Sequence, residues 1–262
     1  MNNNTFQFNR FYKLIVRNLQ RNPKSWIQNV LIFAGLPLVF FLINLSNISA
    51  AINLANRVSF LEILTGFTFI FSPFMLFFNY NHPKKGLSEV MLPASVFEKY
   101  IVIQLACILI APLSVILLYG GMDTLLALMF PKIYGGYAVQ QFFQSSINWN
   151  NISQMFVTQQ AILFCNFLFI RRKVLKTAGA FILSLIVFST IMGIGMTIWD
   201  SQTPFTNVEN LSFSFGSRNF FEIHVNDHPV VIAMQIVRIF LQVVLPAALM
   251  IGSYFIMKTK RY

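Results

Sequence analysis

Long apolar runs separated by short charged stretches constrain the fold of this chain more than any single motif. Hydrophobic residues make up 56% of the 262 residues and charged residues only 10%, whereas a soluble domain carries about 25% charged residues. Since a helix needs ~20 apolar residues to cross ~30 Å of hydrocarbon, the pattern predicts an all-α, polytopic membrane protein. One transmembrane domain over residues 1–262 would hold six spans, at about 27–45, 58–79, 100–119, 153–170, 177–199 and 230–257.

The positions of Lys and Arg predict the orientation of these spans. All but four of the 19 lie before the first span, in the loop 80–99, at 171–176 or at the C-terminal end. Because cytoplasmic flanks collect positive residues, we expect both termini and the loop 80–99 to be cytoplasmic. The connections 120–152 and 200–229 would then be extracytoplasmic. The four remaining cations are Arg57, Lys132, Arg218 and Arg238.

The residues before the first span have two faces when drawn as a helix over 8–24. The apolar face holds Phe8, Phe11, Ile15 and Leu19, and the opposite basic face holds Arg10, Lys13, Arg17, Arg21 and Lys24. Such a helix lies in the membrane plane with its cations near lipid head groups. The pattern indicates either an interfacial helix packed beside the bundle or an ordinary positive flank of the first span. No cleavable signal peptide is evident, so we expect the first span to act as an uncleaved signal anchor.

The fourth predicted span is unusually polar. Amide and hydroxyl side chains in lipid are costly, so they are expected to face other helices or a wet cavity. These residues are Gln154, Thr158, Gln159, Gln160 and Asn166.

Two charges near the outer ends of spans form a candidate intramembrane pair. Arg238 has Gln235 and Gln242 on its own helical face, and Glu62 lies near the start of the second span. Arg238 would either pair with Glu62 inside the bundle or extend its side chain to the membrane surface.

The recognisable catalytic and ligand-binding motifs are missing from the sequence. It has no nucleotide-binding Gly-Lys-Ser/Thr loop, no His-Glu-x-x-His and no Gly-x-Ser-x-Gly, so we predict that this chain is not an enzyme. No nucleic-acid-binding module is evident. His224, Asp227 and His228 have a metal-like spacing, but a solvated loop is the favoured interpretation and no metal site is predicted. Cys107 and Cys165 lie in apolar runs and are expected to be reduced core residues.

The polar stretch 81–100 separates two strongly apolar runs. Ser95 is followed three residues later by Glu98 and then by an apolar run, which is the capping-box pattern of a helix start. We therefore expect a short helix or turn at about 86–92, a break at Pro93 and a new helix from about Val96.

Within this stretch, the run Leu92-Pro93-Ala94-Ser95 with Glu98-Lys99 resembles a segment of permease subunits of bacterial type-2 ABC exporters. The basic N-terminal helix and the six spans are similar to the same family. The resemblance implies a multi-pass protein of the bacterial cytoplasmic (inner) membrane that pairs with a second permease copy or a related permease. A partner ATPase subunit would bind Mg-ATP, and this chain would hold no cofactor. The resemblance assigns ATPase coupling to Lys84, Lys85, Leu87, Glu89, Met91 and Leu92, and a re-entrant element to 230–237.

The expected function is export of a substrate that the sequence does not identify, by a permease in the lipid bilayer. The alternatives are a structural or assembly membrane protein without transport, or a channel.

Overall fold

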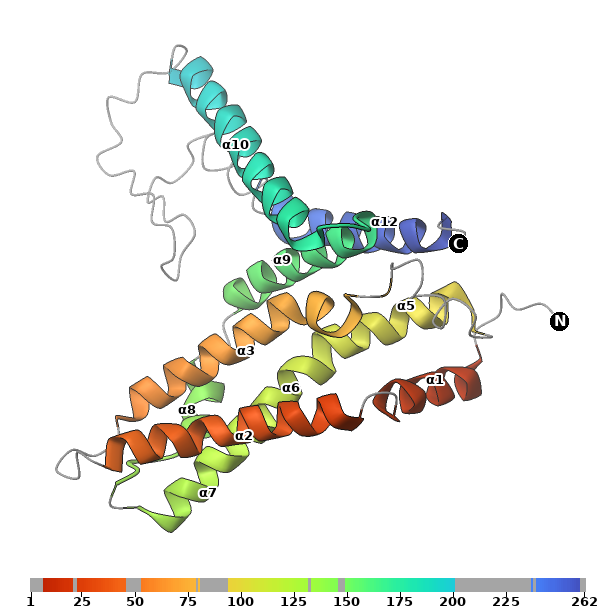
Figure 1. Ribbon diagram of the computed structural model, residues 1–262. Coiled ribbons are helices and arrows are strands. Elements are labelled where there is room, and N and C mark those ends of the chain that lie inside the picture. The colour runs from red at the N-terminus through yellow and green to blue at the C-terminus, as the bar shows by residue number, and fades with distance from the viewer. Residues whose placement is uncertain are drawn as a thin grey trace.

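Helices are the only regular elements in the part of the chain that the structure, a computed structural model, describes (Figure 1). That part comprises residues 7–20, 23–45, 53–78, 80, 94–131, 133–145, 149–200, 237 and 239–259. Its elements are α1 (Phe8–Gln20), α2 (Pro23–Leu45), α3 (Leu54–Phe77), α5 (Val96–Leu105), η1 (Ala106–Ile110), α6 (Ala111–Val115), η2 (Ile116–Gly120), α7 (Gly121–Met129), α8 (Ala138–Ser145), α9 (Trp149–Leu168), α10 (Lys173–Asp200), η3 (Phe240–Val244) and α12 (Leu245–Thr259). The predicted all-α class is confirmed for these residues.

Four helical stretches among the described residues are long and apolar enough to cross a membrane. They are Leu54–Phe77, Val96–Met129, Lys173–Ile191 and Phe240–Thr259, and they match the predicted second, third, fifth and sixth spans. α2 and α9 occupy the positions of the predicted first and fourth spans. The four helices support a membrane protein, while the count of six spans and the orientation of the termini stay predictions.

The third of the predicted spans belongs to a much longer helix. The elements from α5 to α7 follow one another without a break over Val96–Met129, which is 34 residues. At 1.5 Å per residue this helix is about 51 Å long, compared with ~30 Å of hydrocarbon. The helix continues past residue 119, the end of the predicted third span, because Gly120 and Gly121 keep ordinary helical backbone angles instead of stopping it. The connection begins at Phe130 and contains the short helix α8.

π-helical turns on both sides of Pro112 accommodate this proline within the long helix. Proline has no N–H, and its ring pushes away the carbonyl four residues earlier. At η1 the hydrogen bond spans five residues instead of the four of an α-helix, because the N–H of Ala111 donates to the carbonyl of Ala106. A second π turn, η2, follows at Ile116–Gly120. The helix therefore passes the proline without ending.

α9 lies between α3 and α12 and packs closely on both (Figure 1). Glycines allow this approach. A Cβ added at Gly66 of α3 would lie 3.2 Å from the Cε of Met155, and one at Gly252 of α12 would lie 2.9 Å from the ring of Phe164. The predicted span with the most polar sequence thus packs closely on two other helices.

Most of the predicted N-terminal amphipathic helix lies in α1. α1 covers Phe8–Gln20 and α2 begins at Pro23, and proline is well suited to the first position of a helix, where its missing N–H would be unpaired anyway. Lys24 lies in the first turn of α2. Arg21 lies outside the described residues.

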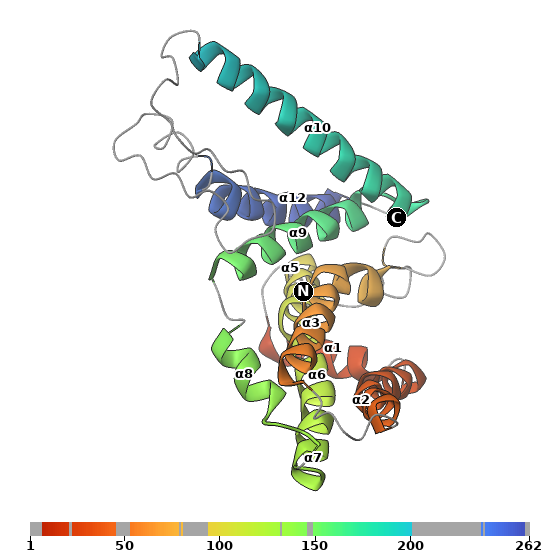
Figure 2. The same cartoon turned by 90° about the vertical axis from the view of Figure 1, so that its left-hand side faces the viewer.

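α10 leaves the other helices at an angle (Figures 1 and 2). Its first turn packs near α9, but most of its apolar side chains are exposed, including Leu183 at 64% and Ile191 at 61%. Exposed apolar surface of this extent is expected of a helix whose neighbours are lipid or another protein. The predicted fifth span, 177–199, lies within this helix.

Candidate functional site

A pocket of about 550 Å³ lies between α3, the long third helix, α8 and α9. α3 lines it with residues spaced three and four apart, which form one face of a helix. These are Ala55, Val58, Ser59, Glu62, Thr65, Gly66 and Phe69. The other walls consist of Pro112, Ile116, Gln141, Phe142, Phe143, Asn151, Ile152 and Met155.

Most of this lining is apolar or aromatic, with a few polar groups. Glu62 is the one charged side chain among the lining residues that the structure describes. Two amides, Gln141 and Asn151, and two hydroxyls, Ser59 and Thr65, complete the polar set. An apolar cavity with a few converging polar groups is typical of small-molecule sites. These groups can recognise a ligand by charge and hydrogen bonds.

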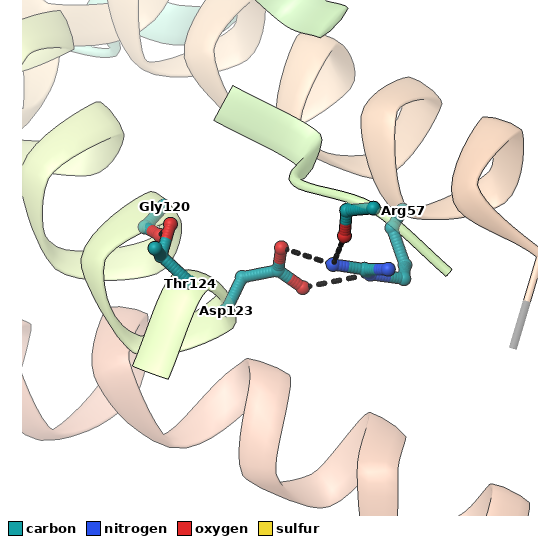
Figure 3. A network of polar contacts seen from close by, with 5 residues as sticks. Arg57, Gly120, Asp123 and Thr124 are labelled. Atoms are coloured by element: carbon teal, nitrogen blue, oxygen red, sulfur yellow. Dashed lines mark hydrogen bonds and ion pairs between the residues drawn. The ribbon is translucent and has the colours of Figure 1, made fainter. Parts of the chain in front are cut away.

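A buried ion pair joins α3 to α7 (Figure 3). The guanidinium of Arg57 donates from Nε to Oδ1 of Asp123 at 2.9 Å and from Nη2 to Oδ2 at 2.6 Å. Both side chains are almost completely enclosed, at 0% and 1% exposure. The two-pronged geometry matches the fork of a guanidinium to a carboxylate. It fixes the start of α3 against the end of the long third helix.

The connection after α7 completes the surroundings of Arg57. Nη2 also lies 3.3 Å from the carbonyl of Gly136, and the guanidinium carbon lies 4.1 Å from the centre of the Tyr134 ring. Gly136 has φ of +84°, a conformation that glycine adopts without strain. Burial raises the pKa of Tyr134 to about 12, the Asp123 carboxylate adds to this rise and Arg57 opposes it. The phenol therefore stays neutral and offers an aromatic face to the cation.

The sequence did not reveal this pair. The predicted partner of Glu62, Arg238, lies outside the described residues, so the Glu62–Arg238 pair stays a prediction. Asp123 is the only acidic residue between Glu98 and Asp200, and an isolated acid near a span end is the signal that could have directed attention to it. Arg57, assigned to the outer flank of the second span, is instead fully buried.

Amide side chains, together with the hydroxyls of Tyr100 and Ser72, link four helices in the interior. Gln104 of α5 and Gln160 of α9 donate to each other's carbonyl oxygens at 3.0 Å. Gln104 also donates to the hydroxyl of Tyr100, which donates to the carbonyl of Met250 on α12. Gln159 donates to the hydroxyl of Ser72 on α3 at 3.4 Å. The prediction that the fourth span turns amides toward other helices is confirmed for Gln159, Gln160 and Asn166, all at 0% exposure.

Asn166 forms a second buried junction, near the ends of α3 and α9. Its Nδ2 donates to the carbonyls of Pro73 at 2.9 Å and Phe77 at 3.2 Å, and its Oδ1 accepts from Nζ of Lys173 at 2.9 Å. Lys173 also donates to the carbonyl of Phe78 and is 3% exposed. One amide therefore satisfies backbone groups of a proline-containing helix and a buried cation.

Glu98 joins α1 to the start of α5. The predicted capping box is confirmed, because Ser95 N–H donates to Oε2 of Glu98 at 2.8 Å and Glu98 N–H donates to Oγ of Ser95 at 3.1 Å. The other oxygen, Oε1, accepts from the N–H of Gln7 at 2.7 Å, just before α1. One carboxylate thus satisfies amides at the starts of two helices, where negative charge is favourable.

α1 packs on α5, and Leu14 of α1 is buried. On the predicted basic face, Lys13 and Arg17 are exposed, and Arg10 is half-buried and donates to Oε1 of Gln7. Phe8, on the predicted apolar face, is 73% exposed. α1 therefore presents both apolar and basic groups outward, as an interfacial helix does.

Other predicted sites fall outside the described residues. All six coupling residues do so, namely Lys84, Lys85, Leu87, Glu89, Met91 and Leu92, as do His224, Asp227, His228 and the segment 230–236. Within the described ranges, no three His, Cys, Asp or Glu side chains are grouped so that they could hold a metal ion. Cys107 and Cys165 are buried free thiols, as predicted.

Comparisons of this chain with protein-family models, with curated proteins and with solved structures found no match.

Proposed function

We propose that this chain is the membrane-spanning permease subunit of a bacterial ABC exporter in the cytoplasmic membrane. It pairs with a second copy or a related permease and takes energy from a separate ATPase subunit that binds Mg-ATP. The observation that carries the proposal is the Glu98 junction. The proposed docking residues 84–92 directly precede α5, and Glu98 ties the start of α5 to α1. A displacement of the docking loop would therefore reach a spanning helix and an interfacial helix together.

The arrangement of helix ends also supports the proposal. The start of α1, the start of α5 and the end of α12 lie at the same end of the molecule (Figure 1). A cytoplasmic position for that end agrees with the positive flanks of the sequence. The pocket with Glu62 lies toward the start of α3, so it would lie nearer the opposite membrane surface. An exporter needs to receive the movement of the ATPase at one end and to release its substrate at the other end.

Isolation of a tagged chain from its native membrane tests the proposal. An ATP-hydrolysing subunit should copurify with the chain. The double variant Glu89→Ala/Leu92→Ala should lower the recovered ATPase about tenfold, which corresponds to ~1.4 kcal/mol of binding free energy. The loss is expected because the two side chains would supply a charged and an apolar contact to the partner.

Ser184→Ala is the matched control for this experiment. Ser184 lies on α10, and its hydroxyl donates to the carbonyl of Phe181 in the same helix. This variant should recover as much ATPase as the unmodified chain. An unmodified chain that recovers no ATPase under native conditions would contradict the proposed function.

A further inference from the structure

We propose that the third and sixth predicted spans carry a matched pair of hinges, at the π turns η1 and η3, about which α5 and α12 tilt together relative to α3. Each hinge is a π turn that ends two residues before a proline, Pro112 in the third span and Pro246 in the sixth. The use of this movement in transport rests on the proposed function, whereas the movement itself is a property of this chain alone.

The two hinges have the same hydrogen bonding. At η1 the N–H of Ala111 donates to the carbonyl of Ala106, and at η3 the N–H of Leu245 donates to the carbonyl of Phe240. In both helices the next residue is a proline, which has no N–H to donate. The regular series of helical hydrogen bonds is therefore interrupted at these two places. Prolines and π turns are the usual positions at which long helices bend.

The hydrogen bond from the Tyr100 hydroxyl to the Met250 carbonyl places both hinges at one level. The middle of η1, Ile108, lies eight residues after Tyr100, and the middle of η3, Gln242, lies eight residues before Met250. The start of α5 and the end of α12 lie at the same end of the molecule (Figure 1), so both counts run in the same direction. Each corresponds to about 12 Å of helix, and the two helices can therefore bend side by side.

The long third helix changes its packing partners at its hinge. Before the hinge, α5 packs on α1 and α12, and the Tyr100 ring meets the ring of Tyr254 edge-on at 5.8 Å. From the hinge onward, η1, α6 and η2 pack on α3, and the ion pair between Arg57 and Asp123 fixes the far end to α3. The segments on the two sides of η1 are thus held by different helices, as a hinge requires.

Ser72 of α3 holds the hinge of the third helix by a bond that can be exchanged. Because the π turn directs the preceding amide to Ala106 and Pro112 has no N–H, the carbonyl of Cys107 receives neither of these amides. It accepts instead from Oγ of Ser72 at 3.2 Å. The same hydroxyl lies 2.9 Å from the carbonyl of Phe69 in its own helix. Its proton can serve either carbonyl, so η1 can move away from α3 while the hydroxyl stays hydrogen-bonded.

Distances between two spin labels on the purified full chain in lipid nanodiscs test the inference. The labels are attached to cysteines that replace Lys258 of α12 and Met75 of α3, both exposed, while Cys107 and Cys165 are buried. We expect two distances, the longer one for α12 tilted away from α3. Pro112→Ala returns an N–H to the hinge and should lower the population at the longer distance about fivefold, as one regained backbone hydrogen bond predicts.

Three further variants test the parts of the hinge separately. Pro246→Ala should lower the population at the longer distance in the same way, because α5 and α12 tilt together. Ser72→Ala removes the bond to Cys107 and should raise that population. Pro37→Ala is the matched control, since α2 continues through Pro37 as an α-helix, and it should leave both populations unchanged.

A second label pair tests whether the movement is confined to one side of the hinge. Ser59 of α3 and Leu128 of α7 are exposed and lie beyond η1, so labels there should give one distance in every variant. A single distance between the labels at 258 and 75 in the chain with both prolines would overturn the inference. Equal populations with and without Pro112, or a fall in Ser72→Ala, would also overturn it. All of these measurements use the chain without an ATPase, so their outcome is separate from that of the copurification experiment.

Discussion

Replacing Arg57 by leucine should destabilise the folded chain by about 3–5 kcal/mol, because it leaves the Asp123 carboxylate buried without its counter-ion. Asp123→Leu should cost a similar amount for the same reason. Both side chains are almost fully enclosed, so water cannot compensate the remaining charge. The free energy of unfolding is measured in mixed detergent micelles by titration with a denaturing detergent.

The double variant Arg57→Leu/Asp123→Leu separates the ion pair from the packing around it. Removing both charges should recover most of the free energy of unfolding that each single variant loses. A buried ion pair often stabilises a protein no more than apolar residues of similar volume do. The free energy of unfolding of Arg57→Lys should lie between those of the unmodified chain and Arg57→Leu, because lysine keeps the charge but not the two-pronged fork. Arg17→Leu removes an exposed cation and should change the free energy by no more than about 0.5 kcal/mol. Additive single-variant losses in the double variant would contradict the pairing.

This pair shows where reasoning from sequence alone reaches its limit. Local pattern placed Arg57 at a span end and Asp123 in a connection, and both positions are compatible with exposure to water. Their contact depends on the helix continuing through Gly120 and Gly121 to Met129. Two adjacent glycines commonly end a helix, but here tertiary packing overrides their low helix propensity. Once the helix continues, Asp123 lies on it at the level of the start of α3.

The all-α class and the burial of the amides in α9 were easier to predict, because both follow from the cost of polar groups in lipid. Apolar runs of nearly 20 residues leave few alternatives to spanning helices. Amides in such a run have to be buried against protein, as Gln159 and Gln160 are. The sequence could not name their partners, Ser72 and Gln104, because helix order and rotation decide those contacts. The capping box at Ser95 and Glu98 was predictable for the opposite reason, since all its atoms lie within four residues.

Glu98 shows that a local motif can hide a long-range role. The capping box uses only one of its carboxylate oxygens, and the second is available to Gln7, 91 residues earlier in the sequence. Nothing in the pattern around Ser95 predicts which amide takes the second oxygen. The candidate pocket is a similar case of a local pattern with distant partners. The lining residues of α3, spaced three and four apart, can be read from the sequence, but the walls from α8 and α9 cannot. Single-helix periodicity predicts a face, and only packing shows what that face encloses.

The second large effect is expected at Asn166, whose amide serves α3, α9 and α10 together. Asn166→Leu should destabilise the chain by about 1.5–3 kcal/mol, because Lys173 loses a hydrogen bond to its charged group and the carbonyls of Pro73 and Phe77 lose a donor. Asn166→Asp restores an acceptor for Lys173 but no donor for the carbonyls, so it should recover only part of the loss. The measurement is again the free energy of unfolding in mixed micelles, with Ser184→Ala as an exposed control. In a double-mutant cycle with Lys173→Met, the coupling energy should exceed about 1 kcal/mol, and a coupling energy near zero would show that Asn166 and Lys173 act independently.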